Sequence, residues 1–308
     1  MVGYRNEHTI ASSCEVRGRG YWSGQEVCVR FHPAPISRGV VFVRSDLEGQ
    51  PECHAQIQSA NGIQFRTNLA NGKAEFQMVE HVMAALAGLE IDNCIVEVDA
   101  CEMPGMDGSS HAYVQCLQSA GLVIQAATKS VLVVEDSMSF EMDDASIKIT
   151  PSLDGNTYFG YSLDYGDASC IPSQSFDFEC TPRSFVRQVA PARTFVTLEQ
   201  AEQLRSSGVA AHVTNQDLLV ISDRGVVDNK YRFRNECARH KTLDLIGDLS
   251  LAGVDLVGRV YSNRGGHRLN AMVAACLAEL AQGGEGPKGR GLKTWRSETH
   301  SIANRKAA

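Results

Sequence analysis

The chain of 308 residues lacks two patterns that direct proteins to membranes or out of the cell. No stretch approaches the roughly 18 uncharged apolar residues that a membrane helix needs. The start, MVGYRNEHTI, lacks the basic and then apolar pattern of a secretory signal. We therefore expect a cytoplasmic protein with no integral membrane segment, which leaves room for a transient contact with a membrane surface.

The sequence also lacks paired cysteines and an excess of positive charge. Its ten cysteines are scattered singly, with no CxxC motif, so we expect reduced and mostly buried thiols rather than a disulfide framework or a zinc finger. The 36 acidic and 29 basic side chains give a formal charge of −7. This balance argues against a nucleic-acid-binding protein, although a local basic pocket could still hold a phosphate.

Apolar residues make up 43% of the chain and charged residues 21%, which is a globular composition of one large or two ordinary domains. Strand-like runs alternate with helix pairs in each half. This order predicts an α+β fold of two domains, each a β-sheet layer covered by helices. Helices are expected near residues 79–89, 110–121, 182–189, 198–206, 235–251 and 267–281.

We expect an N-terminal domain over residues 1–126 and a C-terminal domain over 127–282, with a small insert at about 194–222. The polar segment 124–130 is predicted to link the two. From Gly283 onward the pattern collapses into a tail with six basic and two acidic side chains, which carries +4 and leaves −11 on the rest. We expect this tail to be mobile.

Three short elements could together form a metal hydrolase site. The first, Glu80-His81, opens an apolar helix, where adjacent side chains point in different directions. One could bind a metal while the other holds a water molecule near it. Taken alone, the pair also fits surface charge or a hydrogen-bonded histidine.

The second element lies on the predicted helix over 235–251. His240 and Asp244 are four residues apart, so their side chains share one face of the helix and could bind one cation. Asp248, one turn further, could orient a ligand as an acceptor. An exposed ion pair across one turn is the alternative, but the surrounding leucines predict burial, and buried charges need partners.

The third element is Arg264-Gly265-Gly266-His267-Arg268-Leu269-Asn270, between a strand and a helix. The glycine pair allows the backbone to approach a ligand and places His267 at the start of the helix. An ordinary helix entry that contains a histidine fits the spacing equally well.

Together these motifs resemble the UDP-3-O-acyl-N-acetylglucosamine deacetylases, the zinc enzymes of the first committed step of lipid A synthesis. The similarity runs from about Glu7 to Ala281 and rests on five segments in the same order. These are EHVMAALAGLEIDN, PGMDGSSHAYV, ARTF, RHKTLDLIGDL and GGHRLN. The resemblance implies two similar α+β domains packed as a sandwich with their helices together and the active site between them.

The resemblance assigns the metal ligands to His81, His240 and Asp244, which would leave a coordination position for water. Zinc is the implied cofactor, and iron(II) fits the same ligand set. Glu80 falls on the family's general base and His267 on its general acid.

The resemblance also assigns roles near the reacting carbonyl to three further residues, Asp248, Lys241 and Thr194. Asp248 supports His267, and Lys241 matches the lysine near the reacting carbonyl. In the implied reaction, Glu80 takes a proton from water, and Thr194 and Lys241 are candidate donors to the oxyanion. Protonated His267 then supplies a proton to the departing glucosamine nitrogen.

The resemblance also implies substrate contacts. Phe195 belongs with Thr194 in the site wall, Asp164 and Tyr165 flank the nucleotide, and Arg264 replaces a lysine near the diphosphate. The implied partner is therefore a small UDP-sugar lipid precursor, and we expect a monomer. Asp107 is expected to shape the turn before a helix rather than to touch substrate.

Two segments depart from the family's pattern. The early motif reads Gly18-Arg19-Gly20-Tyr21-Trp22-Ser23-Gly24, with Trp22 in place of the family's histidine. The stretch from Val209 to Asp217, with His212, lacks the family's glycine pair in the insert that forms the acyl-chain passage. Two alternatives therefore stay open: a divergent deacetylase or amidohydrolase of another acetylated sugar nucleotide, and a non-catalytic UDP-sugar sensor.

Overall fold

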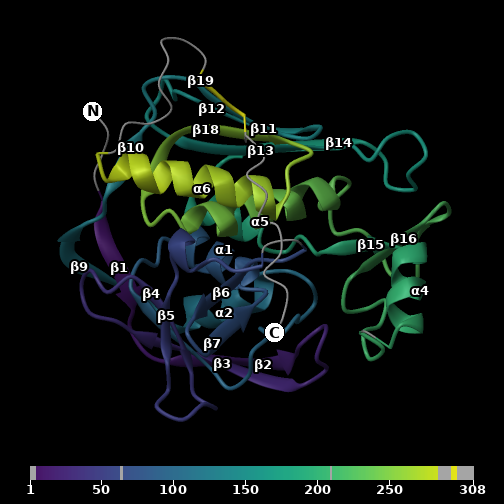
Figure 1. Ribbon diagram of the computed structural model, residues 1–308, viewed down its shortest axis with the longest axis horizontal. Coiled ribbons are helices and arrows are strands. Elements are labelled where there is room, and N and C mark those ends of the chain that lie inside the picture. Colours follow the sequence, from purple (N-terminus) through teal and green to yellow (C-terminus); the bar gives the residue numbers. More distant parts are fainter. Residues whose placement is uncertain (1–4, 63–64, 209, 284–292, 297–308) are drawn as a thin grey trace, which may run out of the picture.

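The computed structural model describes residues 5–62, 65–208, 210–283 and 293–296. Two large sheets form its outer layers, and the main helices lie between them, as Figure 1 shows. The predicted α+β fold is confirmed, with a sheet layer and a helix layer from each half of the chain.

The first half builds a five-stranded sheet. Its strands, in spatial order, are β2 (Cys14–Arg19), β3 (Glu26–Pro33), β8 (Cys94–Val98), β4 (Val40–Arg44) and β5 (Glu52–His54). Only β4 and β8 run parallel. Cys94, Val96 and Val98 alternate with less buried residues along β8, as expected for a strand with one face toward a helix layer.

The second half builds a seven-stranded sheet. Its main path is β14 (Gln174–Glu179), β13 (Thr157–Leu163), β18 (Asp255–Asn263), β12 (Ala145–Thr150), β11 (Met138–Met142) and β19 (Lys293–Arg296). The short strand β10 (Val131–Val133) pairs in parallel with β18 outside this path. Because β13 and β18 are parallel neighbours, both end at the same edge of the sheet.

Three small sheets complete the strands. They are β1 (Asn6–Ile10) with β9 (Leu122–Thr128), β6 (Asn68–Asn71) with β7 (Ala74–Gln77), and β15 (Phe195–Thr197) with β16 (Leu219–Ser222) and β17 (Gly225–Val226). Helix α4 (Leu198–Ser206) connects β15 to its parallel partner β16. Residues 195–222 therefore form a β-α-β unit, which projects to one side in Figure 1.

Four helices occupy the space between the two large sheets. They are α1 (Glu80–Gly88), α2 (His111–Ala120), α5 (Glu236–Ser250) and α6 (His267–Ala281), while α3 (Pro182–Gln188) and the 3₁₀ turn η1 (Ile57–Ser59) lie beside them. Twelve of the fifteen residues of α5 are buried, because other helices and a sheet cover it on several sides. Its charged side chains therefore need partners within the protein.

Helices α1 and α5 cross in close contact at Gly247. A Cβ atom at this position would lie 2.2 Å from the carbonyl oxygen of Glu80, which is closer than two such atoms can approach. Glycine therefore permits the backbone of α5 to pass directly over the first turn of α1. This crossing brings the start of α1 next to the middle of α5.

Two predictions about irregular segments differ from the structure. Most of the expected linker 124–130 belongs to β9, which pairs antiparallel with β1. Backbone pairing stabilises this strand although its side chains are largely exposed, and so it has no apolar periodicity to reveal it. In the tail that was expected to be mobile, Lys293–Arg296 forms β19, which pairs with β11 at the edge of the seven-stranded sheet. The rest of the tail beyond Gly283 lies outside the described residues, as does Val209.

Candidate active site

Three buried side chains converge where α1 meets α5. His81 is the second residue of α1, and His240 and Asp244 lie one turn apart on α5. Asp244 Oδ1 lies 3.3 Å from His240 Nε2 and 3.6 Å from His81 Nε2. The three ligand atoms lie within 4.8 Å of one another, so a single metal ion could contact all three.

His240 is held in the orientation and protonation state that a metal ligand needs. Its Nδ1 lies 3.1 Å from the carbonyl oxygen of Ala192 and donates to it, which leaves Nε2 without a proton and facing Asp244. Burial lowers the pKa of His240 to about 4, despite the opposing charge of Asp244. The imidazole is therefore neutral at ordinary pH, the form in which histidine binds metals.

Asp244 is ionised and carries a second contact. Lys241 Nζ lies 2.8 Å from Asp244 Oδ2, opposite the oxygen that faces the histidines. Burial opposes the charge on Asp244, but its electrostatic interactions with His240 and Lys241 outweigh burial and hold the pKa of the carboxyl well below its usual value. Burial likewise opposes the charge on Lys241, and Asp244 outweighs it, so that the pKa of the lysine is raised.

Glu80 lies directly before the first ligand and is also buried. Its Oε2 accepts a hydrogen bond of 3.0 Å from the backbone N–H of Thr67. Burial raises the pKa of Glu80, and the nearby imidazoles of His267 and His81 oppose that shift. A carboxylate with a raised pKa beside a metal site has the properties of a general base.

His267 and Asp248 form a buried pair one turn further along α5. His267 is the first residue of α6, and its Nδ1 lies 2.8 Å from Asp248 Oδ2. Burial disfavours the charged imidazole, but the charge and hydrogen bond of Asp248 outweigh burial and raise the pKa of His267 to about 9. At neutral pH the imidazole therefore carries a proton on Nε2 as well, as a general acid requires.

Asp248 has two further partners that the sequence analysis did not identify. Asn270, one turn after His267 on α6, donates from Nδ2 to Asp248 Oδ2 at 2.8 Å. Thr67 donates from Oγ1 to Asp248 Oδ1 at 2.5 Å. The three-residue spacing of His267 and Asn270 could have indicated the first contact, whereas no local pattern marks Thr67.

A buried ion pair fixes the segment that leads into β15. Arg193 Nε lies 2.8 Å from Glu236 Oε1, and both side chains are buried. On either side of Arg193, the Ala192 carbonyl accepts from His240, and the Thr194 N–H donates to the carbonyl of Gly108 at 2.7 Å. Sequence reasoning used this arginine only as part of a motif, and its role here is to position its neighbours.

Phe195 lies beside the metal-ligating residues. Its ring centroid is 6.3 Å from that of His240 and 6.4 Å from that of Tyr165, and both contacts are edge-to-face. Tyr165 is 51% exposed, so its ring remains accessible in the loop after β13. The structure thus brings Phe195 and Tyr165 together next to the site.

Asp164 and Arg264 have other partners in this structure. Asp164 Oδ1 accepts from the Gly166 N–H at 2.8 Å and from Ser173 Oγ at 3.0 Å, so it shapes the loop that carries Tyr165. Arg264 Nη2 lies 2.6 Å from Asp144 Oδ2, in a largely exposed pair. Neither is joined to the metal-ligating residues by a direct contact between described side chains.

Asp107 has the structural role that was expected. It accepts from the backbone N–H and the Oγ of Ser109, at 3.1 and 2.6 Å, just before α2. It also pairs with Arg232 at 2.7 Å.

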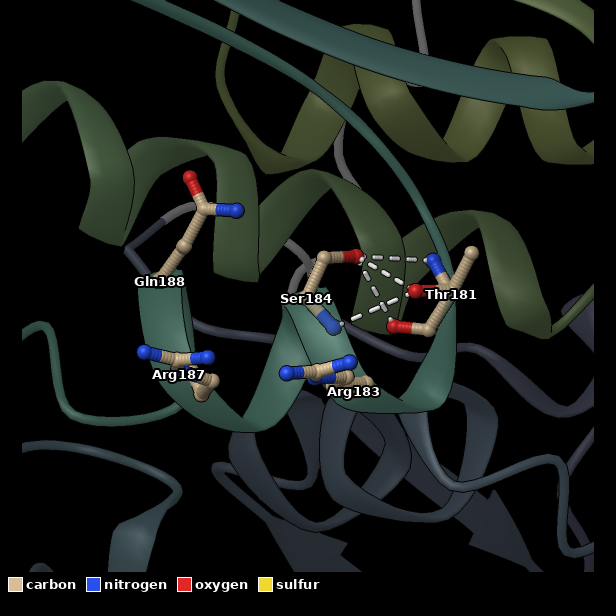
Figure 2. Close-up of a pocket in the computed structure, with 5 residues that line it drawn as sticks. All are labelled: Thr181, Arg183, Ser184, Arg187 and Gln188. Atoms are coloured by element: carbon tan, nitrogen blue, oxygen red, sulfur yellow. Dashed lines mark hydrogen bonds between the residues drawn. The ribbon is translucent and has the colours of Figure 1, made fainter.

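A surface pocket on α3 is separate from these residues. Figure 2 shows it lined by Thr181, Arg183, Ser184, Arg187 and Gln188, with Thr181 and Ser184 joined by the hydrogen bonds of a capping box. It contains no histidine, cysteine or carboxylate that could bind a metal. We therefore place the candidate active site at the α1–α5 crossing.

A buried set of two histidines and an aspartate, with a carboxylate beside it and a charged imidazole nearby, defines the site of a metal-dependent hydrolase. Comparison with known proteins agrees with this class. Residues 7–279 match the family model of UDP-3-O-acyl N-acetylglycosamine deacetylase, and the chain belongs to this family.

Curated relatives carry the name UDP-3-O-acyl-N-acetylglucosamine deacetylase. The protein of Trichormus variabilis is 35% identical over 280 residues, which cover 89% of this chain and 99% of the relative. The protein of Anaeromyxobacter sp. strain Fw109-5 is 36% identical over 278 residues, 90% of each chain. That of Thioalkalivibrio sulfidiphilus is 36% identical over 268 residues, 86% of this chain and 87% of the relative.

Among the helices in the described part of the chain, none is both long enough and apolar enough to cross a membrane.

Proposed function

We propose that this protein hydrolyses the N-acetyl group of UDP-3-O-acyl-N-acetylglucosamine, giving acetate and the free amine, as a step of lipid A synthesis. The observation that carries the proposal is the convergence of His81, His240 and Asp244 beside Glu80 and His267. Membership of the deacetylase family supports the choice of substrate.

The donor set fits zinc, because two imidazoles and one carboxylate leave a coordination position for water or substrate. Bound there, the ion would lower the pKa of a water molecule and polarise the acetamide carbonyl. The same ligands also suit iron(II), so the metal is to be identified by its content in the protein as purified from cells.

The chain's own residues would move the protons. Thr67 holds Oε2 of Glu80, so we expect the other carboxylate oxygen to take the proton of the attacking water. Asp248 holds Nδ1 of His267, which leaves the proton on Nε2 for the departing glucosamine nitrogen. An amide nitrogen leaves poorly as an anion, so this protonation is needed for the bond to break.

Two further residues would stabilise negative charge on the reacting carbonyl oxygen. Lys241 points toward the metal-ligating set, since its Nζ contacts Asp244. Thr194 lies between the Gly108 carbonyl and β16, and its Cγ2 would be 3.0 Å from a Cβ added at Gly108. We propose both as donors to the oxyanion.

The remaining proposed roles concern the substrate and the molecule as a whole. We propose that Phe195 packs against the glucosamine, that Tyr165 stacks on uracil with Asp164 beside it, and that Arg264 leaves Asp144 to bind the diphosphate. We also propose a cytoplasmic monomer that divides into domains near residue 126, and sedimentation of the purified protein tests its oligomeric state.

Acetate release from the acylated substrate tests the function directly. We expect turnover that depends on zinc or iron(II) and is lost in Glu80→Ala with its metal retained. Turnover of unacylated UDP-N-acetylglucosamine alone would support the divergent alternative. Binding of the acylated substrate without any acetate release would support the sensor.

A further inference from the structure

Thr67 joins the proposed general base to the proposed general acid. Its backbone N–H donates to Glu80 Oε2 on α1, and its Oγ1 donates to Asp248 Oδ1 on α5 at 2.5 Å. The same Oγ1 lies 3.3 Å from His267 Nδ1 at the start of α6. Thr67 is 1% exposed. The position of this one residue therefore sets how Glu80 and the Asp248–His267 pair lie relative to each other.

The backbone of Thr67 is hydrogen-bonded to the residue that precedes α1. The Thr67 carbonyl accepts from the Val79 N–H at 3.0 Å, directly before α1. Thr67 itself precedes β6 and lies in neither a helix nor a strand. Nearby, the backbone N–H of Asn61 donates to the carbonyl of Asn68 at 2.9 Å. The side chain of Arg66 supplies a further contact directly beside Thr67.

Trp22 provides that contact from the turn between β2 and β3. The guanidinium carbon of Arg66 lies 4.9 Å from the centroid of the Trp22 ring, within the range of a cation–π interaction. Trp22 is 39% exposed, so solvent reaches part of the ring while Arg66 covers another part. The stack connects the β2–β3 turn to the segment that carries Thr67.

The turn that carries Trp22 is itself firmly anchored. The two oxygens of Glu102, a buried side chain, accept from the backbone N–H groups of Trp22 and Ser23, each at 2.8 Å. A second anchor comes from the β15–β16 unit, where His212 Nε2 lies 2.8 Å from the Gly20 carbonyl. The Trp22 ring thus offers Arg66 a fixed surface.

We infer that Trp22 is a positioning residue for the deacetylation: by stacking on Arg66 it holds Thr67 where Glu80 and the Asp248–His267 pair are aligned. The expected fall in kcat rests on the proposed function, whereas the expected loosening of the segment around Thr67 rests only on the contacts in the structure. A histidine at position 22 would present a smaller ring to the guanidinium and would not replace the stack.

The experiment compares Trp22→Ala, Trp22→His and Trp22→Phe with the wild-type protein. We expect kcat for the acylated substrate to fall about fivefold in Trp22→Ala, the factor that one cation–π contact supports. KM and metal content should stay unchanged, because Trp22 touches neither the metal ligands nor the proposed substrate contacts. Trp22→Phe, which keeps an aromatic face, should recover most of the loss, and Trp22→His should not.

Hydrogen–deuterium exchange gives a reading that does not depend on activity. We expect faster exchange in Trp22→Ala for peptides that contain Thr67, because its N–H bond to Glu80 opens more often. The matched control is Tyr158→Ala in the seven-stranded sheet. It removes a similar stack, in which the guanidinium carbon of Arg259 lies 4.0 Å from the centroid of the Tyr158 ring. It should change neither kcat nor exchange at Thr67.

The outcomes separate this inference from the proposed function. Unchanged kcat in Trp22→Ala, a rise in KM alone, or faster exchange throughout the protein would overturn the positioning role. If the wild-type protein releases no acetate, the proposed function fails, and the local exchange at Thr67 then decides whether Trp22 holds this segment.

Discussion

His267 Nδ1 lies 2.8 Å from Asp248 Oδ2, and both side chains are buried between α5 and α6. Asp248 also accepts from Asn270 and Thr67, so its carboxylate is held on three sides. Burial alone would favour the neutral imidazole of His267, but the negative charge of Asp248 outweighs burial and favours the protonated form. This one contact therefore determines whether the site contains a proton donor at neutral pH.

The first prediction concerns the pH dependence of kcat. Because the pKa of His267 is raised to about 9, the donor is protonated below that pH, and activity should decline as the pH rises through about 9. Asp248→Asn removes the negative charge beside His267, and we expect the alkaline limb of the kcat profile to move to lower pH by up to about two pH units. Profiles of kcat for both proteins check this, and coincident limbs would contradict it.

The second prediction concerns stability and follows from the same pKa. His267 has a higher pKa in the folded protein than its usual 6.5, so the folded state binds the proton more tightly. The resulting stability is fully present below about pH 6.5 and is lost as the pH rises to about 9, in total about 3 kcal/mol. Urea unfolding at both ends of this range should show the loss in the wild-type protein.

His267→Gln serves as the comparison for this loss. Every other titrating group is common to the two proteins, so the difference between their pH dependences isolates the contribution of His267. Equal changes in the free energy of unfolding for both proteins would show that His267 is not charged in the folded state.

The elements that carry the ligands could be predicted because their signals are local. His240 and Asp244 are one turn apart on a helix, so their proximity follows from helical geometry alone. The predicted helix over 267–281 has the observed bounds of α6, with His267 as its first residue. The resemblance to a known family supplied what spacing could not, the association of His81 with the other two ligands.

The parts that escaped prediction depend on contacts between distant segments. Thr67 and Asp248 are 181 residues apart, and Thr67 lies in an irregular stretch without periodicity. The stack of Arg66 on Trp22 also joins two turns that only the fold brings together. The strand β9 was missed for a related reason, since its pairing with β1 and not its own apolar pattern stabilises it.

The third prediction concerns metal binding. Asp244→Ala removes one ligand and also leaves the partly buried Lys241 without its partner. We expect metal affinity to fall at least about a hundredfold, since even supporting residues of metal sites contribute 10–100-fold. Metal content after dialysis checks this loss. Asp248→Asn is the matched control on the same helix and should retain the metal, because Asp248 contacts His267 and not the ligands.

The fourth prediction tests the crossing of α1 and α5. In Gly247→Ala the new methyl group would meet the carbonyl oxygen of Glu80, a backbone atom that can move only with its helix. Separating the helices should cost about 1–3 kcal/mol and draw His81 away from His240 and Asp244, so both the free energy of unfolding and the metal content should fall. Gly88→Ala, near the end of α1, would instead meet the buried ring of Phe185, which belongs to a side chain and not to the backbone of α5 or α1. This control should lose stability with its metal retained, and the same metal loss in both variants would show that the close approach at Gly247 has no special role in the site.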